Sequence, residues 1–282
     1  MLKIRPAAEC GFDVLVRTIN AGYADYFTPV HFTRATYDFF VRSHGIDLER
    51  SVVAEEDGVP VGIAQLAHRG AEGWVAGVAV VPSRRRQGIG RRLMAAIREN
   101  AVLARLQRLR LEVISQNTAA MALYENSGWR LGRELLVWYR PAEQGVLPIP
   151  RELLQAVDPA KLLENCFHWH DQTPCWQRSR ETLRHYLKIG CQGWAIVREG
   201  RPVAYVLGGR PVAGQLHLLD VAVDPSVGIR SAGRPLIQAL HLKYQDTTTQ
   251  LLNEPVESHL NPLFAAMAYR VKYRQYEMFL DL

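Results

Sequence analysis

The sequence predicts a mixed α/β fold built from two tandem copies of one domain. Segments with strand and helix patterns are mixed along its first half, as in a sheet covered by helices. Similar segments recur about 140 residues apart, and 282 residues suffice for about two domains of ordinary size. We expect domains at residues 1–142 and 151–282, joined by a linker at residues 143–150.

The repeat is visible in three places at nearly constant offsets. The turn at Gly58 matches the turn at Gly200, 142 residues later, and each lies between two strand-like segments. Val78–Pro82 matches Val221–Pro225 at an offset of 143. Near the end of each half, residues 128–130 match residues 268–270 at an offset of 140. Small insertions in loops account for the drift, so we infer a duplication.

The elements of the first half follow from hydrophobic periodicity and turn residues. Thr33 or Thr36 can cap a helix, and the Val-rich segment 74–81 reads as a strand buried on both faces. Helices are predicted at residues 19–27, 33–44, 88–104 and 118–126. Strands are predicted at residues 51–55, 60–68, 74–81, 109–115 and 135–139.

The predicted boundary between the halves lies in a segment that disfavours regular structure. Pro141, Gly145, Pro148 and Pro150 fall within ten residues, which suits a linker. An edge strand at residues 146–149 that bridges the halves is the alternative.

Composition excludes several protein classes. Lys and Arg exceed Asp and Glu by 34 to 28, a net charge of +6 that is small for a DNA-binding protein. Four cysteines without a CxxC pair argue against a disulfide scaffold and common zinc sites. The segment 166–171 with Cys175 fits no metal spacing, so we expect it to pack as a loop without metal.

Neither a membrane segment nor a secretion signal is evident in the sequence. No apolar stretch approaches the roughly 18 residues that a membrane helix needs. Glu9, Asp13 and Arg17 occupy the region where a signal peptide has its apolar core. We therefore expect a soluble, cytoplasmic protein that does not bind membranes.

The strongest chemical pattern is a glycine-rich, arginine-rich turn at residues 80–92. It follows the Val-rich strand and precedes an amphipathic helix, where glycines and free backbone amides can bind a phosphate group. Only Gly88-x-Gly90 of a Rossmann fingerprint is present, and the GK[ST] of a P-loop is absent. From the turn alone, a basic turn without a ligand remains an alternative.

Two motifs together resemble the GCN5-related N-acetyltransferase (GNAT) superfamily. Arg85-Arg86-Gln87-Gly88-Ile89-Gly90 is similar to its acyl-CoA motif, Gln/Arg-x-x-Gly-x-Gly/Ala. The segment from Asn117 to Trp129 is similar to its second motif, Asn-x-x-Ala-x-x-Leu-Tyr-x-x-x-Gly-Phe, with Trp in place of Phe. The resemblance covers most of residues 1–140. It implies GNAT-like domains, each a mostly antiparallel twisted sheet with helices on both faces.

The resemblance also implies a binding site for acetyl-CoA as co-substrate, in a gap beside a bulged central strand. Gly77 is the expected bulge position. Tyr124 would lie near the CoA sulfur and protonate the thiolate. The backbone of the strand would bind the pantetheine arm of CoA, and the turn that follows it would bind the diphosphate. An asparagine side chain would form a further hydrogen bond with the CoA arm. The residues in these roles are Val78, Ala79, Val80, Arg85, Arg86, Gln87, Gly88, Ile89, Gly90, Arg91 and Asn117.

Each of the other candidate residues has a structural alternative. Glu112 is the candidate general base, and it can equally pair with an arginine. Tyr26 and His31 are the candidate acceptor-binding residues within an aromatic segment that can instead be core. Tyr124 can simply pack on the sheet, and Asn117 can cap the helix that follows it.

The second half departs from both motifs. The offset of 143 places Gly228, Ser231 and Gly233 opposite Arg85, Gly88 and Gly90, and the offset of 140 places Phe264 opposite Tyr124 and Glu257 opposite Asn117. We therefore expect residues 151–282 to form a GNAT-like domain that does not catalyse transfer, packs on the first domain and helps to shape the acceptor site.

The expected function is acetyl transfer from acetyl-CoA to a primary amine of a small molecule or peptide, by direct attack in a ternary complex. A CoA-binding regulatory module without turnover is the alternative. We expect no nucleic-acid partner, because the arginine cluster already has a use in binding a diphosphate. A monomer is favoured over a homodimer, because a tandem pair can replace the dimer of single-domain relatives.

Overall fold

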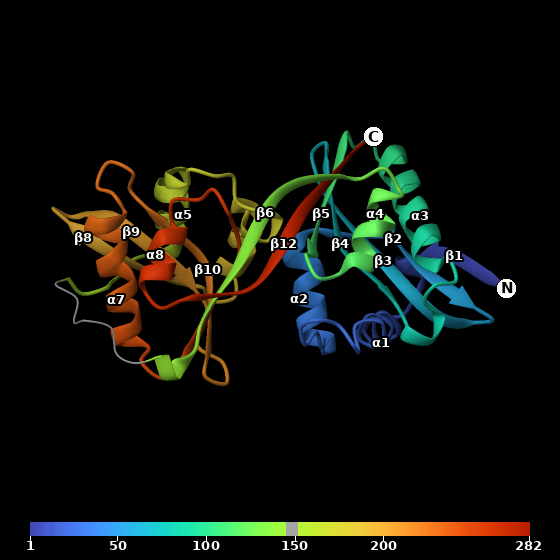
Figure 1. The fold of residues 1–282 in the computed structure, drawn as a ribbon, viewed down its shortest axis with the longest axis horizontal. Helices are drawn as coiled ribbons and strands as arrows, with labels where there is room; N and C mark the ends of the chain where they lie inside the picture. The colour runs from blue at the N-terminus through green and yellow to red at the C-terminus, as the bar shows by residue number, and fades with distance from the viewer. Residues whose placement is uncertain (145–151) are drawn as a thin grey trace. The chain divides into compact units, whose positions relative to one another are not determined.

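The computed structural model describes residues 1–144 and 152–282, which form two compact units (Figure 1). Unit 1 comprises Met1–Arg133 and Tyr276–Leu282, and unit 2 comprises Glu134–Gln275. These bounds differ from two contiguous halves, because the end of the chain returns to unit 1. Most of the expected linker, and all of the alternative edge strand at 146–149, lies outside the described residues.

Unit 1 contains a central sheet in the order β1-β2-β3-β4-β5, followed by the end of β12. The pairs from β1 to β4 are antiparallel, and β4 pairs with β5 in parallel. β6 (Arg130–Arg140) and β12 (Arg270–Asp281) have residues in both units. The other elements are β1 (Leu2–Pro6), α1 (Phe12–Gly22), α2 (Arg34–His44), β2 (Ile46–Glu56), β3 (Val59–Arg69), β4 (Glu72–Val80), α3 (Ile89–Leu103), β5 (Arg108–Ile114) and α4 (Thr118–Glu125).

Helices cover both faces of this sheet, as the family resemblance implies (Figure 1). On one face, a Cβ at Gly22 of α1 would lie 2.6 Å from the Cβ of Ala79, so glycine allows α1 to approach β4 closely. On the other face, Gly62 of β3 lies under Leu93 of α3. Met278, from the end of the chain, is buried in the core on that side.

Most predicted elements of unit 1 are confirmed to within a few residues, but the first helix is not. The prediction placed it at residues 19–27, whereas α1 spans Phe12–Gly22. Its buried face recurs at helical spacing through Leu15, Thr18, Ile19 and Gly22. At α2, both predicted caps act together, since the Thr33 and Thr36 hydroxyls each accept a hydrogen bond from the other's backbone amide.

Unit 2 repeats the topology of unit 1. Its sheet has the order β6-β11-β10-β9-β8-β7, with a parallel pair between β10 and β11. The pairs β6–β11, β10–β9, β9–β8 and β8–β7 are antiparallel. Its elements are β7 (Gln155–Ala156), α5 (Pro159–Cys166), α6 (Arg180–Leu187), β8 (Gln192–Arg198), β9 (Arg201–Gly208), β10 (Gln215–Val223), α7 (Arg234–Lys243), β11 (Thr248–Pro255) and α8 (Asn261–Ala266). The repeat inferred from the sequence is therefore a repeat of structure.

The cysteine- and histidine-rich segment 166–171 is part of the packing of unit 2. Cys166 and Trp169 are buried in its core, and His170 Nε2 lies 3.1 Å from Asp220 Oδ2. Across residues 1–144 and 152–282, no three His, Cys, Asp or Glu side chains gather as metal ligands would. Within the same residues, no helix combines the length and apolarity that spanning a membrane requires.

A buried histidine in unit 2 makes its stability depend on pH. His241 of α7 is 5% exposed, and its Nε2 lies 2.9 Å from the Tyr269 hydroxyl. Burial and the nearby Arg140 guanidinium lower its pKa to about 3. In the unfolded chain its pKa is about 6.5. The unfolded chain therefore binds a proton first, and stability falls as the pH drops through this interval.

We predict that His241→Gln flattens the dependence of unfolding free energy on pH between about pH 6 and 5. The loss should approach about 1.4 kcal/mol per pH unit in the parent protein, and much of it should disappear in the variant. Urea unfolding at several pH values measures it. His168→Gln, at an exposed position, is the matched control. Equal slopes for His241→Gln and the parent would contradict the prediction.

Candidate active site

A gap between two parallel strands of unit 1 is the centre of the candidate site. β4 and β5 pair only over Glu72–Trp74 and Arg108–Arg110, although both strands continue. Beyond Trp74 the backbone of β4 no longer pairs with β5. Ala76, Gly77 and Val78 are partly exposed there, unlike the buried residues before them. The gap that the resemblance implied is therefore present between these strands.

The expected bulge lies in β4, one residue before the predicted position. Gln65 of β3 pairs with Gly77 and Leu66 with Val75, which leaves Ala76 as the extra residue. Gly77 follows it and has a different use. A Cβ at Gly77 would lie 3.0 Å from the Tyr23 hydroxyl and 3.5 Å from Gln65 Oε1. The glycine thus leaves space for polar groups above the bulge.

The three predicted backbone positions of β4 do not all face the gap. The Val81 amide donates to the Val61 carbonyl in β3 at 2.9 Å. Amides alternate in direction along an antiparallel strand, so the Ala79 amide also points toward β3. The amides of Val78 and Val80 then point toward the gap. Two of the three predicted positions can therefore bind a ligand there through their backbone.

The loop before α3 presents backbone amides that the fold leaves unused. Arg86 and Gly88 have positive φ angles of 64° and 78°, and Gly88 is the N-cap of α3 without a capping side chain. Such alternation turns successive amides inward as an anion-binding nest. The Arg85 amide is an exception, because it donates to the Pro82 carbonyl at 3.3 Å. Among the described residues, the amides from Arg86 to Gly90 have no such partner.

The arginines of this loop divide into structural and available groups. Arg85 binds both carboxylate oxygens of Asp25, at 2.8 and 2.6 Å, and the carbonyls of Gly22 and Val80 at 3.0 Å. Arg84 is paired with Glu56 at 2.6 Å. The Arg85 side chain therefore ties the end of α1 to β4. Its guanidinium is paired within the fold, and its contact with a ligand stays a prediction.

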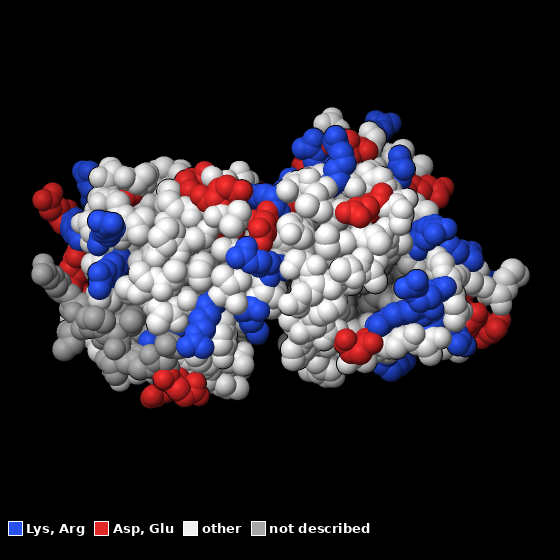
Figure 2. All heavy atoms as spheres, viewed as in Figure 1, with Lys and Arg blue, Asp and Glu red and all other residues white. Residues whose placement is uncertain are grey.

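Two other arginines remain available around the loop. The side chains of Arg86 and Arg91 form no hydrogen bond or ion pair with the rest of the described chain. Figure 2 shows basic side chains gathered on the unit that contains the N-terminus, beside a hollow in its surface. A guanidinium is a cation with several N–H donors, so both side chains can meet an anionic ligand at the start of α3.

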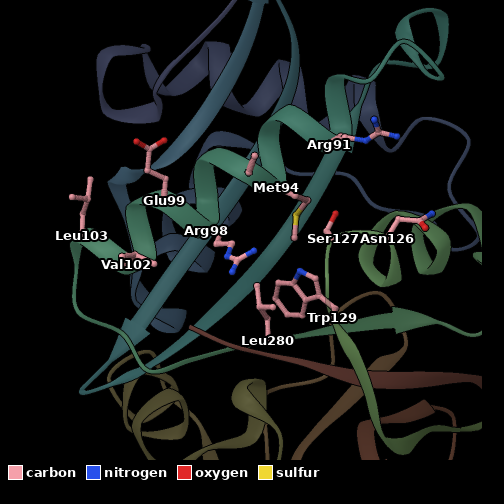
Figure 3. A pocket seen from close by; sticks show the side chains of 11 residues that line it. Arg91, Met94, Arg98, Glu99, Val102, Leu103, Asn126, Ser127, Trp129 and Leu280 are labelled. Carbon is pink, nitrogen blue, oxygen red and sulfur yellow. The ribbon is translucent and has the colours of Figure 1, made fainter.

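A groove of about 480 Å³ continues from this loop along α3 (Figure 3). Arg91 lies at one end, and Arg98 extends into the groove from the same helix. Met94, Trp129 and Leu280 supply apolar surface. The groove therefore offers both cationic and apolar groups next to the loop amides.

Three tyrosines, Tyr23, Tyr26 and Tyr124, form a cluster beside the gap and influence one another electrostatically. Burial raises the pKa of Tyr124, and the neighbouring Tyr26 raises it further. Burial also raises the pKa of Tyr23, while a hydrogen bond from the Val78 amide acts in the opposite direction. The rings of Tyr23 and Tyr26 pack edge to face at 4.8 Å. All three hydroxyls thus stay protonated at neutral pH and can donate hydrogen bonds.

Asn117 caps α4, the structural role that the sequence offered for its side chain, and it also contacts a tyrosine near the gap. Its Oδ1 accepts a hydrogen bond from the Ala120 amide at 3.2 Å and caps α4. A hydrogen bond from the same side chain partly offsets the effect of burial on the pKa of Tyr26. Asn117 therefore joins α4 to the tyrosine cluster, and its contact with a CoA arm remains a prediction.

The candidate base, Glu112, lies on β5 at the start of the gap. Its Oε2 accepts a hydrogen bond from the Trp74 indole at 2.7 Å. The nearby Arg110 pairs with Glu72 at 2.8 Å. The carboxylate thus has an indole partner that fixes its orientation at the edge where β4 and β5 separate.

The two candidate acceptor-binding residues differ in position. Tyr26 belongs to the tyrosine cluster, whereas His31 is exposed on the loop between α1 and α2. Tyr23 was not among the predicted site residues, although it contacts the bulge through Gly77. The aromatic segment that contains Tyr23 pointed to this region, but the sequence did not distinguish its members.

The corresponding gap of unit 2 is bridged by a buried ion network. β10 and β11 pair from Gln215 to Leu218 only, and a bulge at Leu219 follows. Arg178 then links the two strands, since it binds Asp220 of β10 at 3.0 Å and Glu254 of β11. The side chains of Asp220, Glu254 and Arg178 are at most 3% exposed.

The loop before the helix of unit 2 is also changed. Only five residues separate the end of β10 from helical structure at Ile229, because a π-helix (Ile229–Gly233) precedes α7. The amides of Ser226, Val227 and Gly228 all donate to Asp224, through its carboxylate or its carbonyl. The carboxylate and the carbonyl of Asp224 thus accept hydrogen bonds from the amides that an anion would need.

A comparison with protein families identifies the part of the chain that carries the site. Residues 16–129 match the family described as "Acetyltransferase (GNAT) family". These residues belong to the GNAT superfamily. The matched range includes the bulged strand, the loop before α3, and the Asn117 and Tyr124 motif. No curated protein matches the chain.

Solved structures place the whole chain, both GNAT-like units included, in a known fold. A GCN5-related N-acetyltransferase from Sphaerobacter thermophilus matches at a TM-score of 0.74 and 17% identity, over 99% of this chain and 95% of that one. A tandem GNAT protein from the clavulanic acid biosynthesis pathway matches at a TM-score of 0.77 and 16% identity, over 100% of this chain and 98% of that one. A GCN5-related N-acetyltransferase from Kribbella flavida matches at a TM-score of 0.62 and 16% identity, over 100% of this chain and 71% of that one.

Proposed function

We propose that unit 1 transfers an acetyl group from acetyl-CoA to a primary amine by direct attack within a ternary complex. The observation that carries this proposal is the strand gap beyond Trp74, which opens beside the unused amides of the loop before α3. A thioester with a diphosphate some distance along its arm fits those two features together. The glycines and arginines of the loop alone would not distinguish acetyl-CoA from other ligands that carry phosphate groups.

The bound co-substrate would use different parts of the site along its length. The amides from Arg86 to Gly90, with the helix dipole, would hold the diphosphate. Arg86 and Arg91 would supply countercharge, and the groove along α3 would receive the nucleotide end. The backbone of Val78 and Val80 would bind the arm in the gap.

The reaction needs three things from the protein. As the amine nitrogen attacks the thioester carbon, a C–N bond forms and the C–S bond breaks. The carbonyl oxygen gains negative charge, which the N–H of Val78 would stabilise once the bound thioester takes the place of the Tyr23 hydroxyl on it. The departing thiolate would take a proton from the Tyr124 hydroxyl. The proton lost by the amine would pass through water to Glu112.

Unit 2 is proposed to be non-catalytic and not to bind acetyl-CoA. Arg178, Asp220 and Glu254 bridge its strand gap, and Asp224 occupies the amides of its shortened loop. Phe264, which has no hydroxyl, stands where the sequence repeat has Tyr124. One molecule of acetyl-CoA should therefore bind to each chain.

A screen for release of the CoA thiol tests the proposal. The full chain is mixed with acetyl-CoA and a panel of primary amines, namely polyamines, aminoglycosides, amino acid esters and peptides with a free α-amino group. Amine-dependent thiol release with acetylated product supports transfer. Tight binding of acetyl-CoA with no release for any amine would favour the regulatory CoA-binding module instead.

We predict that Tyr124→Phe lowers kcat by about 100-fold while the Kd for acetyl-CoA stays unchanged, since the variant loses a proton donor and little packing. Steady-state kinetics with the most active amine and calorimetry with acetyl-CoA measure the two effects. Tyr269→Phe is the matched control, because Tyr269 is buried in unit 2. If both variants lower kcat equally, Tyr124 is not the proton donor.

A further inference from the structure

One buried polar atom at the bulge of β4 has no partner in the fold. Gln65 of β3 is completely buried, and its Nε2 donates to the Tyr37 hydroxyl at 2.8 Å. Its Oε1 lies without a hydrogen-bond partner among the described residues. An unpaired buried acceptor usually costs about 1–3 kcal/mol, so such groups are rare and call for a reason.

The position of this atom relates it to the candidate site. Gln65 pairs with Gly77, the residue that follows the bulge. A Cβ at Gly77 would lie 3.5 Å from Gln65 Oε1 and 3.0 Å from the Tyr23 hydroxyl. The unpaired oxygen therefore lies above the bulge, one residue from the Val78 amide that faces the gap. It is on the α1 and α2 side of the sheet, because Tyr37 belongs to α2 and Tyr23 follows α1.

The surrounding side chains hold the Gln65 amide in place. Tyr37 is itself completely buried, and its ring packs against Phe12 at 5.3 Å and Phe32 at 5.5 Å. The Asn20 side-chain amide donates to the Phe32 carbonyl and accepts from the Phe32 backbone amide, at 2.8 Å in each case. The Gln65 oxygen is thus preorganised, and a substrate would not have to order it on binding.

We propose that Gln65 Oε1 accepts a hydrogen bond from the acceptor amine and selects an amine over a hydroxyl group. This inference rests on the proposed function. A neutral primary amine has two N–H groups, so one can stay on Gln65 while the other proton leaves through the base. An alcohol has a single O–H, whose proton must leave, so it cannot keep this bond through the reaction.

In the transfer step, the bonds and protons balance with Gln65 unchanged. The C–N bond forms and the C–S bond breaks, the thiolate receives the proton of Tyr124, and the base receives one amine proton. The second N–H remains on the product amide nitrogen, still directed at Gln65 Oε1. Gln65 therefore positions the nucleophile and exchanges no proton.

The test replaces Gln65 by methionine, which has a similar length and no oxygen or nitrogen. The expected result is a rise of about tenfold in KM for the most active amine of the panel, since one hydrogen bond to substrate is lost. The Kd for acetyl-CoA should not change. The melting temperature should change little, because the variant removes an unpaired buried acceptor but also leaves the buried Tyr37 hydroxyl without its donor.

Two further variants separate substrate binding from packing. Gln65→Glu keeps an oxygen at the same place and should recover most of the amine affinity that Gln65→Met loses. Tyr37→Phe releases the Gln65 amide from its partner and should raise KM for the amine without changing the Kd for acetyl-CoA. Thermal unfolding of each variant shows whether it remains folded.

The outcomes distinguish this inference from the proposed function. If the parent protein transfers acetyl groups and Gln65→Met leaves KM for the amine unchanged, the inference about Gln65 is wrong and the proposed function stands. If Gln65→Met instead lowers the melting temperature and Gln65→Glu does not recover amine affinity, Gln65 is a packing residue. Absence of transfer to any amine in the parent overturns both.

Discussion

Gly88→Glu is expected to abolish measurable binding of acetyl-CoA, with a loss of affinity of about 100-fold or more. Gly88 has a φ of 78° and caps α3, and no atom lies within 4 Å of the position of its missing Cβ. The new carboxylate therefore fits without a clash but lies where the diphosphate would bind. Repulsion between the two anions, together with strain at a positive φ, removes the site. Calorimetry with acetyl-CoA measures the change.

Two variants serve as controls for this prediction. Gly88→Asn keeps a residue that tolerates positive φ and adds no charge, so binding should be weakened much less. Gly228 of unit 2 has a similar φ of 83°, and Gly228→Glu should leave both affinity and stoichiometry unchanged. Two equivalent sites in the parent, or an equal loss in Gly228→Glu, would show that unit 2 also binds acetyl-CoA.

Arg178→Met is expected to destabilise the protein by about 3–5 kcal/mol, the usual cost of removing one partner from a buried ion network. Burial opposes the charge of Arg178, but Glu254 and Asp220 outweigh burial and hold its pKa above the usual value. Burial likewise opposes the charge of Asp220, and His170 and Arg178 lower its pKa. The variant would leave two buried carboxylates without their shared cation. Urea unfolding at pH 7 measures the loss.

The control for Arg178→Met is an arginine of the same unit in an exposed pair. Arg274 binds Glu134 at 2.6 Å with half of its side chain in solvent, so Arg274→Met should cost at most about 1 kcal/mol. Adding Asp220→Asn and Glu254→Gln to Arg178→Met should recover part of the stability, because the carboxylates are then neutral. A loss of under about 1 kcal/mol for Arg178→Met alone would mean that solvent reaches this network.

The loop before α3 and the cap of α4 were predictable because their chemistry is local. A positive φ favours glycine at Gly88, and a helix start favours a side chain such as that of Asn117, whatever the rest of the chain does. Gly90 has a packing reason instead, since a Cβ there would lie 3.1 Å from Leu123 of α4. Such short-range constraints leave a readable pattern in the sequence.

The features that the sequence did not predict depend on contacts between distant residues. Arg85 is a structural residue only because the fold brings Asp25 to it, 60 positions earlier in the chain. Gln65 is related to the candidate site only because β3 pairs it with Gly77, and Tyr23 only because it contacts the Val78 amide. In the second half, the loss of motif residues was visible, but the Arg178 network that bridges the strand gap was not.

The order in which the parts of unit 1 leave the ribosome differs from their order in space. Tyr276–Leu282 belong to unit 1, where Met278 is buried in the core and the Leu282 amide donates to the Gln107 carbonyl at 3.0 Å. All of unit 2 is therefore synthesised before the strand that completes unit 1 exists. Although most of its residues come first, the candidate active site is completed only after unit 2, and the proposed acetyl transfer should begin only once the second unit has been made.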